Sequence, residues 1–245
     1  EIPVEFQETV LRDCAELGKE LIVESRCEQL TEEKLAWATS INSTFTVAIG
    51  LEAYDDEVLR FHVNKGFTTK SWDRAVANLE KFNLRIKTYL MFKPPFMNEA
   101  DALDHCVKWI GAVAERSDEI SVNPMNIQRG TVIDRLHRHN EYRPPWLWSL
   151  VEMIRQAHPL IHPEGGVNGD PDQVSRLIVH PTAGGKIRGS HNCGACDAEV
   201  VAAIERYAVS GSLIEFDGLS CECETVWRNE VNLERKLPLP LGLSK

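Results

Sequence analysis

The sequence has no long apolar run, no phosphate-binding loop and no Ser/His/Asp arrangement, and these absences narrow the class of protein. No uninterrupted apolar stretch approaches the ~20 residues that a membrane helix needs, and no signal-peptide pattern stands at the start. The P-loop pattern GxxxxGK and the dinucleotide pattern GxGxxG are also absent. With 43% hydrophobic and 26% charged residues, the 245 residues predict a globular cytoplasmic protein without a membrane partner.

The sequence has fewer basic than acidic residues, and two segments have an excess of basic residues. The chain has 27 Lys and Arg against 37 Asp and Glu, which argues against nonspecific binding of DNA or RNA over the whole surface. Asn126–Pro145 has four arginines against two acids, and Gln173–Asn192 has three basic residues and no acid. A local basic surface of this kind can meet a phosphate backbone, although ordinary variation of surface charge is the alternative. The residues expected to contact RNA are Arg135, Arg138, Lys186 and Arg188.

Before Ala157 the chain alternates strand-like and helix-like segments. Strands are predicted at Leu21–Val23, Phe45–Leu51, Arg85–Phe92 and Glu119–Val122. Helices are predicted near Val4–Leu17, from Thr31, and at Asp55–Val63, Ser71–Phe82 with Ser71 as N-cap, Asn98–Glu115, Thr131–Arg138 and Trp146–Ala157. Such repeated units indicate an α/β protein with a parallel sheet.

The composition changes at Ala157–Asp170, where Pro and Gly residues indicate a loop or linker. Beyond it we predict a smaller α+β unit with a strand at Ser175–His180, a helix at Asp197–Val209 and a strand at Ser212–Phe216. The expected domains are therefore residues 1–158 and 159–245.

Polar side chains follow each of the four strands predicted before Ala157. Because the carboxyl ends of parallel strands meet at one edge of a sheet, these side chains are expected to converge there. Carboxylates at that edge can bind hydroxyl or amino groups, and cations can bind a carboxylate. Each residue taken alone can also be an ordinary strand-end cap. The residues are Glu24, Arg26, Glu52, Lys93, Asn123 and Gln128.

Four of the seven cysteines have metal-ligand spacing. Cys193 and Cys196 form a CxxC, and after 24 residues Cys221 and Cys223 form a CxC, which we expect on one face of a strand. Four thiolates can supply the closed shell of a structural zinc ion. An iron–sulfur cluster, or cysteines without metal, remain alternatives. The other three cysteines are scattered among apolar residues and predict buried thiols.

Several motifs resemble those of radical S-adenosylmethionine (radical SAM) enzymes. The run from Gly50 to Thr68 is similar to the middle of the branch that contains the tRNA methylthiotransferases and the Elongator catalytic subunit. Four further motifs resemble the archaeosine-biosynthesis radical SAM family: YLMFKPPF at 89–96, NPMNIQRGT at 123–131, YRPPWLWS at 142–149 and HNCGACD at 191–197. This resemblance covers nearly the whole chain.

The resemblance implies the C-terminal part of a radical SAM partial (β/α) barrel, followed by a small metal-binding domain near the RNA. It implies a lyase that cleaves a lysine adduct on the D-arm deazaguanine of archaeal tRNA to give the formamidine of archaeosine. Its cofactors would be S-adenosylmethionine and a 4Fe–4S cluster, and its partners tRNA and a lysine-transferring archaeosine synthase protein. Glu24, Arg26 and Glu52 would bind S-adenosylmethionine, and Lys93, Asn123 and Gln128 would line the reaction chamber.

One departure from the family pattern is the absence of CxxxCxxC, the motif that holds the radical cluster. We therefore expect the chain to be a fragment that starts after the third barrel strand, with the cluster ligands upstream and no activity alone. A non-catalytic zinc-containing tRNA-binding module and a methylthiotransferase-like enzyme remain alternatives.

Overall fold

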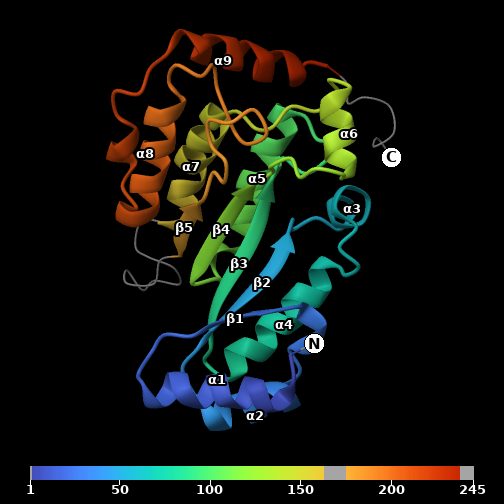
Figure 1. Ribbon diagram of the computed structural model, residues 1–245, viewed down its shortest axis with the longest axis vertical. Coiled ribbons are helices and arrows are strands. Elements are labelled where there is room, and N and C mark those ends of the chain that lie inside the picture. Colours follow the sequence, from blue (N-terminus) through green and yellow to red (C-terminus); the bar gives the residue numbers. More distant parts are fainter. Residues whose placement is uncertain (1, 163–174, 238–245) are drawn as a thin grey trace.

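The computed structural model describes residues 2–162 and 175–237 (Figure 1). Five parallel strands form one sheet in chain order. They are β1 (Ile22–Ser25), β2 (Thr46–Glu52), β3 (Arg85–Phe92), β4 (Glu119–Pro124) and β5 (Arg176–Val179). The helices are α1 (Val4–Glu16), α2 (Glu32–Ile41), α3 (Asp56–Val58), α4 (Thr69–Lys81), α5 (Glu99–Ala114), α6 (Val132–Arg138), α7 (Leu147–Ile161), α8 (Asp197–Ser210) and α9 (Glu222–Glu234), with short turns η1 (Cys27–Gln29), η2 (Leu59–Val63) and η3 (Leu213–Phe216). None of the helices described has the length and apolar character to cross a bilayer.

The two faces of the sheet differ in burial, and β3 shows the difference most clearly. Ile86, Leu90 and Phe92 are buried on the face covered by α4 and α5, because apolar side chains alternate along the strand. Lys87 and Tyr89 point to the opposite face, where they are only half-buried. The sheet therefore presents a polar, partly open face at its centre.

Local signals explain why several predicted elements form where expected. β3 has the predicted bounds. Asn98 caps α5, since its side-chain oxygen accepts a hydrogen bond from the Asp101 N–H at 2.7 Å, and Thr31 caps α2 in the same way. Asp55 caps α3, whose helical path continues as the π-helical turn η2.

Three local predictions are wrong. Ser71 is not the N-cap of α4: Thr68 is, and Ser71 is the third helical residue of a capping box. The strand predicted at Ser212–Phe216 is the 3₁₀ turn η3, in which the Ser212 hydroxyl accepts from the Ile214 N–H. The CxC does not lie on a strand, because Cys221 is the extended N-cap residue of α9 and Cys223 lies in its first turn.

The sheet and the core both run across the boundary predicted between residues 158 and 159. α7 continues to Ile161, and β5 pairs in parallel with β4 as the edge strand of the sheet. One hydrophobic cluster contains Leu11 near one end of the chain and Val231 near the other. The predicted linker falls largely on residues 163–174, which lie outside the described residues.

Figure 1 places α9 across the carboxyl ends of the strands, at the opposite end of the molecule from α1 and α2. α9 packs against α5. The Trp227 indole N–H donates to the Ser149 hydroxyl at 2.7 Å, and Arg235 pairs with Asp104 at 2.6 Å. These contacts fasten the last described helix to the rim of the sheet.

Candidate functional site

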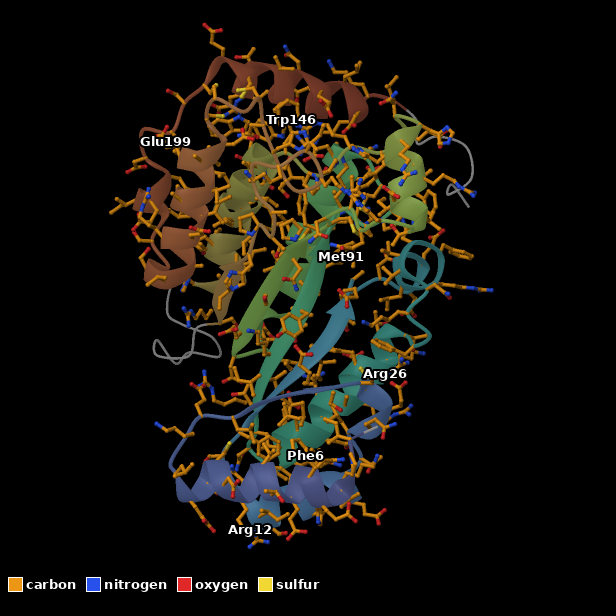
Figure 2. The ribbon with its side chains drawn as sticks, viewed as in Figure 1. Phe6, Arg12, Arg26, Met91, Trp146 and Glu199 are labelled. Atoms are coloured by element: carbon orange, nitrogen blue, oxygen red, sulfur yellow. The ribbon has the colours of Figure 1, made fainter. Side chains whose placement is uncertain are left out.

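The half-open face of the sheet contains a cavity of about 540 Å³ at the carboxyl ends of its strands. It collects side chains from four strands and the loops that follow them, as the sequence predicted for a parallel sheet. Of the residues predicted at this edge, Glu24, Arg26, Glu52 and Asn123 line the cavity. Figure 2 shows the side chains on the ribbon, with Arg26 labelled beside η1. The remaining lining residues are Ser25, Ala48, Gly50, Lys65 and Tyr89.

Glu52 is held in the cavity by an unusual backbone. Its φ of 72° lies in the left-handed region, and the register of β2 against β3 shifts between Gly50 and Glu52, which marks a β-bulge. The Lys65 ammonium donates to Glu52 Oε1 at 2.8 Å, and both side chains are partly buried. Left-handed backbone at a non-glycine residue costs free energy and often accompanies a functional site.

Gly50 lies directly under this ion pair. A Cβ atom at Gly50 would come within 3.1 Å of both Glu52 Oε1 and Lys65 Nζ. A side chain at this position would require the carboxylate and the ammonium to move by a few tenths of an ångström, so glycine lets them lie close to the backbone of β2. The floor of the cavity is bare main chain with one charge of each sign above it.

Tyr89 and Lys65 belong to the cavity, although the sequence prediction did not assign them a role. The Tyr89 hydroxyl donates to Glu24 Oε1 at 3.2 Å, and partial burial raises the pKa of Tyr89 above its ordinary value. Strand alternation could have found Tyr89, because it lies opposite Gly50 in the register of β2 and β3. Lys65 comes from the loop after η2 and no periodic signal points to it.

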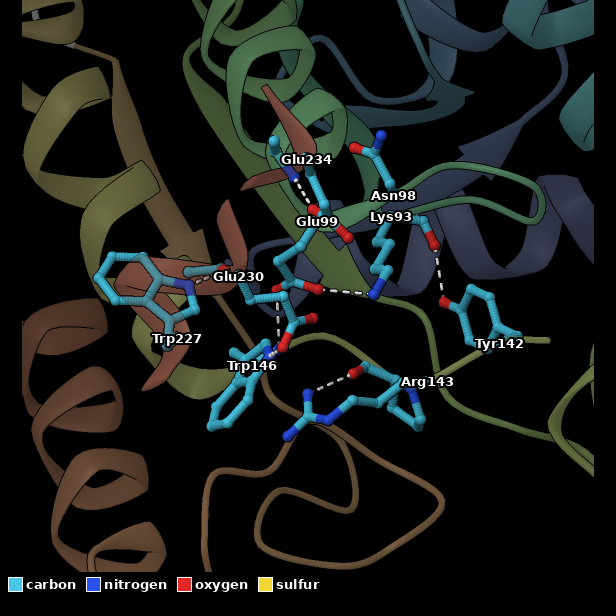
Figure 3. A network of polar contacts seen from close by, with 12 residues as sticks. Lys93, Asn98, Glu99, Tyr142, Arg143, Trp146, Trp227, Glu230 and Glu234 are labelled. Carbon is cyan, nitrogen blue, oxygen red and sulfur yellow. Dashed lines mark hydrogen bonds and ion pairs between the residues drawn. The ribbon is translucent and has the colours of Figure 1, made fainter. Parts of the chain in front are cut away.

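Lys93 was predicted to line the same space, but its ammonium is buried elsewhere. It is 4% exposed and pairs with the fully buried Glu99 carboxylate at 2.6 Å (Figure 3). The reason is local: φ at Lys93 is 56°, so the chain turns sharply where β3 ends and directs the side chain toward the first residue of α5. The structure thus separates Lys93 from Glu24, Arg26, Glu52 and Asn123.

A polar network surrounds this buried pair, as Figure 3 shows. Glu99 Oε1 accepts from the Trp146 backbone N–H at 2.8 Å, and the Tyr142 hydroxyl donates to the Lys93 carbonyl at 2.8 Å. Two glutamates of α9 join from the other side. Glu230 accepts from the Trp146 indole N–H at 3.2 Å, and Glu234 accepts from the Ala100 N–H at 2.9 Å.

Gln128, the remaining predicted chamber residue, is exposed and does not line the cavity. Its amide donates to the side-chain oxygen of Asn126. It lies in the loop between β4 and α6, one residue after Ile127.

The four predicted metal ligands meet at the other side of the rim. The sulfur atoms of Cys193, Cys196, Cys221 and Cys223 all lie within 4.8 Å of one another, and this is the only such cluster of potential ligands among the described residues. Cys193 and Cys221 are 3.7 Å apart, and Cys196 and Cys223 are 3.6 Å apart. A tetrahedral zinc site with Zn–S bonds of about 2.3 Å has sulfur atoms about 3.8 Å apart, so the geometry fits.

N–H groups surround these cysteines and favour the thiolate, whereas burial acts in the opposite direction, raising the pKa of Cys196 and raising that of Cys223 to about 12. Backbone N–H groups of Ala195 and Cys196 lower the pKa of Cys193 to about 7. The Trp148 indole N–H points at the Cys223 sulfur at 3.3 Å, and the Asn192 amide points at the Cys196 sulfur at 3.4 Å. Such donors offset the negative charge of a four-thiolate shell. The predicted metal-ligating quartet is therefore assembled, although its second pair comes from a helix.

The predicted RNA-binding residues fall into two groups. Arg138 and Arg188 both pair with the buried Asp134 carboxylate at 2.7 Å, so one of their two positive charges is offset within the protein. Arg135 and Lys186 are exposed. Arg138 and Arg188 therefore have a structural role, because Asp134 joins α6 to the glycine-rich loop that carries Arg188.

The Asp134 pairing predicts a stability change at acid pH. The Gly130 N–H and the Arg188 guanidinium lower the pKa of Asp134 from 3.8 to about 2, so the folded protein binds this proton less readily than the unfolded chain. The stabilisation is complete above pH ~4 and is lost as the pH falls through about 2. We expect Asp134→Asn to have a lower Tm than the parent at neutral pH, with a difference that narrows toward pH 2.

Thermal unfolding followed by circular dichroism from pH 2 to pH 7 measures this difference. Asp217→Asn, which changes an exposed carboxylate, is the matched control and is expected to alter the Tm little. A gap between Asp134→Asn and the parent that stays constant over the whole range would contradict the prediction.

Comparison with known proteins gives a consistent result. No protein-family model matches the chain. Archaeosine synthase subunit beta of Methanosarcina acetivorans is 33% identical over 238 residues, covering 96% of this chain and 66% of that protein. The protein of the same name from Thermococcus kodakarensis is 32% identical, over 93% of this chain and 68% of its own length. The chain thus spans about two thirds of the length of these relatives.

Among solved structures, the archaeal Elp3 of Methanocaldococcus infernus with an N-terminal deletion superposes with a TM-score of 0.56. The match has 17% identity and covers 82% of this chain and 43% of that protein. This likeness concerns the fold, and it agrees with the radical SAM partial barrel that the sequence predicted.

Proposed function

The chain belongs to the archaeosine synthase subunit beta family, and from this membership we propose that it forms part of a radical SAM lyase that modifies archaeal tRNA. The proposed reaction is the one that the sequence resemblance implies: cleavage of a lysine adduct on the D-arm deazaguanine to leave the formamidine of archaeosine. A lysine-transferring partner protein would supply the adduct. The observation that supports the proposal best is the cavity at the carboxyl rim.

The cavity residues fit S-adenosylmethionine. This cofactor carries an ammonium, a carboxylate and ribose hydroxyls. The carboxylates of Glu24 and Glu52 can accept hydrogen bonds from the ammonium and from the ribose hydroxyls of the cofactor. Arg26 and Lys65 can bind the carboxylate of the cofactor. Gly50 leaves the floor open for a flat group to approach the backbone. When bound and reduced, the cofactor supplies the hydrogen abstraction that starts the cleavage.

The residues of this chain do not fit the radical 4Fe–4S cluster. The sequence has no CxxxCxxC, and the four clustered cysteines form a closed shell, whereas a cluster that binds S-adenosylmethionine needs an iron without a protein ligand. The other three cysteines, Cys14, Cys27 and Cys106, belong to no group of potential ligands among the described residues. No step through the cluster is assigned to these residues.

For the four cysteines we propose a structural zinc ion. A shell of four thiolates leaves no position for substrate, and the N–H donors around it suit a fixed site. The metal would join the loop before α8 to the start of α9, and so hold α9 over the rim. The exposed Arg135 and Lys186 would contact the phosphate backbone of the tRNA.

Binding of S-adenosylmethionine to the chain tests the proposal. Glu52→Gln keeps the size of the side chain but removes the charge that pairs with Lys65 and that would accept from the cofactor. Loss of one charge-assisted hydrogen bond of this kind weakens binding by about tenfold or more. Equilibrium dialysis with radiolabelled S-adenosylmethionine measures the Kd of the parent and of the variant.

Glu20→Gln is the matched control, because Glu20 is an exposed carboxylate at the amino ends of the strands. It is expected to leave the Kd unchanged. Retention of cofactor binding by Glu52→Gln would count against the cavity as the cofactor site. A chain that binds tRNA but not the cofactor would favour the non-catalytic RNA-binding alternative.

A further inference from the structure

The turn that follows β3 has a strained backbone that its sequence does not explain. Lys93 and Phe96 both have left-handed φ angles, 56° and 65°, although neither is glycine. For a bulky aromatic residue this conformation is rare and costs free energy. Pro94 and Pro95 lie between them and fix their own φ angles, so the turn is rigid. Something other than local stability keeps an aromatic residue at position 96.

The strain directs the Phe96 ring outward. Its side chain is 52% exposed, although the residues on either side of this turn, Phe92 and Met97, are buried. The only ring that contacts it among the described residues is His62, edge-on with centroids 6.3 Å apart. The His62 imidazole is itself fixed by a contact of 2.6 Å between its Nδ1 and the Pro95 carbonyl. Phe96 is therefore about half exposed, with the His62 ring against one part of it.

A second exposed aromatic residue lies on the segment that touches this turn. Phe61 is adjacent to His62 in η2, is 54% exposed, and has the Arg60 guanidinium 5.0 Å from its ring centroid. η2 follows β2 and the turn follows β3, so both segments lie after the carboxyl ends of their strands, the end of the sheet at which the cavity is found. Figure 1 shows this rim, with α3 beyond the end of β2.

The same turn is joined to the basic segment around α6. The Tyr142 hydroxyl donates to the Lys93 carbonyl, and the Met125 N–H donates to the Phe92 carbonyl, so the segment that carries α6 begins and ends against the turn. Its outer surface carries Arg129 and Arg135, both exposed. Exposed aromatic rings beside exposed arginines are the combination that binds unpaired nucleotides, because rings stack on bases and cations meet phosphates.

We propose that Phe96, together with Phe61 on the η2 segment that contacts the same turn, is a stacking platform for an unpaired base of the RNA substrate. This inference rests on the proposed function, in that the substrate is tRNA. The exposed area of the rings can stack on a base, and the exposed Arg60, Arg129 and Arg135 supply charge complementary to phosphate. The rigid turn holds the ring in place before RNA arrives, so little side-chain entropy is lost on binding.

An RNA hairpin with one 2-aminopurine in its loop is the probe, together with a blunt duplex of the same length. We expect the chain to change the 2-aminopurine fluorescence on binding. Phe96→Ala is expected to weaken hairpin binding by about 5- to 100-fold and to abolish the fluorescence change, since one base–aromatic stack contributes that much. The slope of log K against log salt stays the same in this variant. Arg135→Ala, in contrast, lowers the slope by about one unit.

Phe6→Ala is the matched control. Phe6 is 59% exposed on α1, at the opposite end of the molecule, and Figure 2 labels it. Its removal is expected to leave hairpin binding unchanged. Duplex binding is expected to be insensitive to Phe96→Ala.

Phe96→Gly separates stacking from folding. Glycine accepts the left-handed backbone without strain, so this variant is expected to have a Tm equal to or above that of the parent, while hairpin binding falls as in Phe96→Ala. Phe96→Trp is expected to retain binding.

Full hairpin affinity in Phe96→Ala, or a chain that binds no RNA, would overturn the platform. Neither result bears on the dialysis experiment, so a failure of the cofactor site and a failure of the platform are distinguishable.

Discussion

Removal of metal from the four-cysteine site is expected to unfold the region of α8 and α9 and to lower the Tm of the whole chain. A structural zinc ion contributes roughly 10–16 kcal/mol of apparent binding free energy in small domains, and that free energy adds to the stability of the folded state. Cys193→Ser reports the same loss with little change in packing, because Cys193 is exposed. Calorimetry with and without a chelator, and elemental analysis for about one zinc per chain, measure the effect.

Cys14→Ser is the control for this experiment. Cys14 is half-buried in α1 and lies outside the cluster, so its substitution is expected to leave the metal content unchanged. Equal Tm values with and without chelator would contradict a structural metal. A brown protein containing iron and sulfide in place of zinc would show that the thiolates hold an iron–sulfur cluster.

Loss of the buried Lys93–Glu99 pair is the second large effect. Lys93→Met leaves the Glu99 carboxylate fully buried, with the Trp146 N–H as its remaining donor in the described network. An unpaired buried charge of this kind destabilises a protein by about 3–5 kcal/mol. The double variant Lys93→Met, Glu99→Gln removes both charges and keeps an acceptor for Trp146, so it is expected to recover part of that loss. Urea unfolding of the single and double variants measures the coupling.

Lys65→Met is the matched control, since Lys65 pairs with Glu52 at a similar distance but remains partly exposed. Partly solvated pairs contribute about 0–1 kcal/mol, so this variant is expected to unfold near the parent midpoint. A Lys93→Met protein as stable as the parent would mean that the pair does not hold the rim together. Lys93 would then be free for the chamber role that the sequence predicted.

Strand and helix signals that act over a few residues were readable from the sequence. β3 alternates apolar and polar residues, and Asn98 with an acid in the first turn predicts the start of α5. α9 was missed although its signal is present: Cys223, Trp227 and Val231 recur every four residues and are all buried. The spacing of the CxC alone predicts a strand. The residues that follow it recur with a helical period, and the segment is a helix.

The sequence does not predict contacts between residues that are distant along the chain, nor left-handed backbone angles at single residues. β5 follows a segment rich in proline and glycine, which favoured a separate unit, yet its hydrogen bonds go to β4. Lys93 continues the strand pattern that places Tyr89 in the cavity, but a left-handed φ reverses its direction. Asp134 lies in a basic segment and pairs with one arginine of that segment and one of the other. In each case the outcome depends on a partner distant in sequence or on one dihedral angle.

The contact between α9 and α5 also orders the events of synthesis. Glu234 accepts from the Ala100 N–H across 134 residues of chain. At roughly 5–20 residues per second, a ribosome takes on the order of 10 s to make that stretch. Until then the first turn of α5 has no carboxylate from α9 at its end, and the cysteine cluster lacks two of its four members. This end of the molecule is therefore completed only after α9 has been translated.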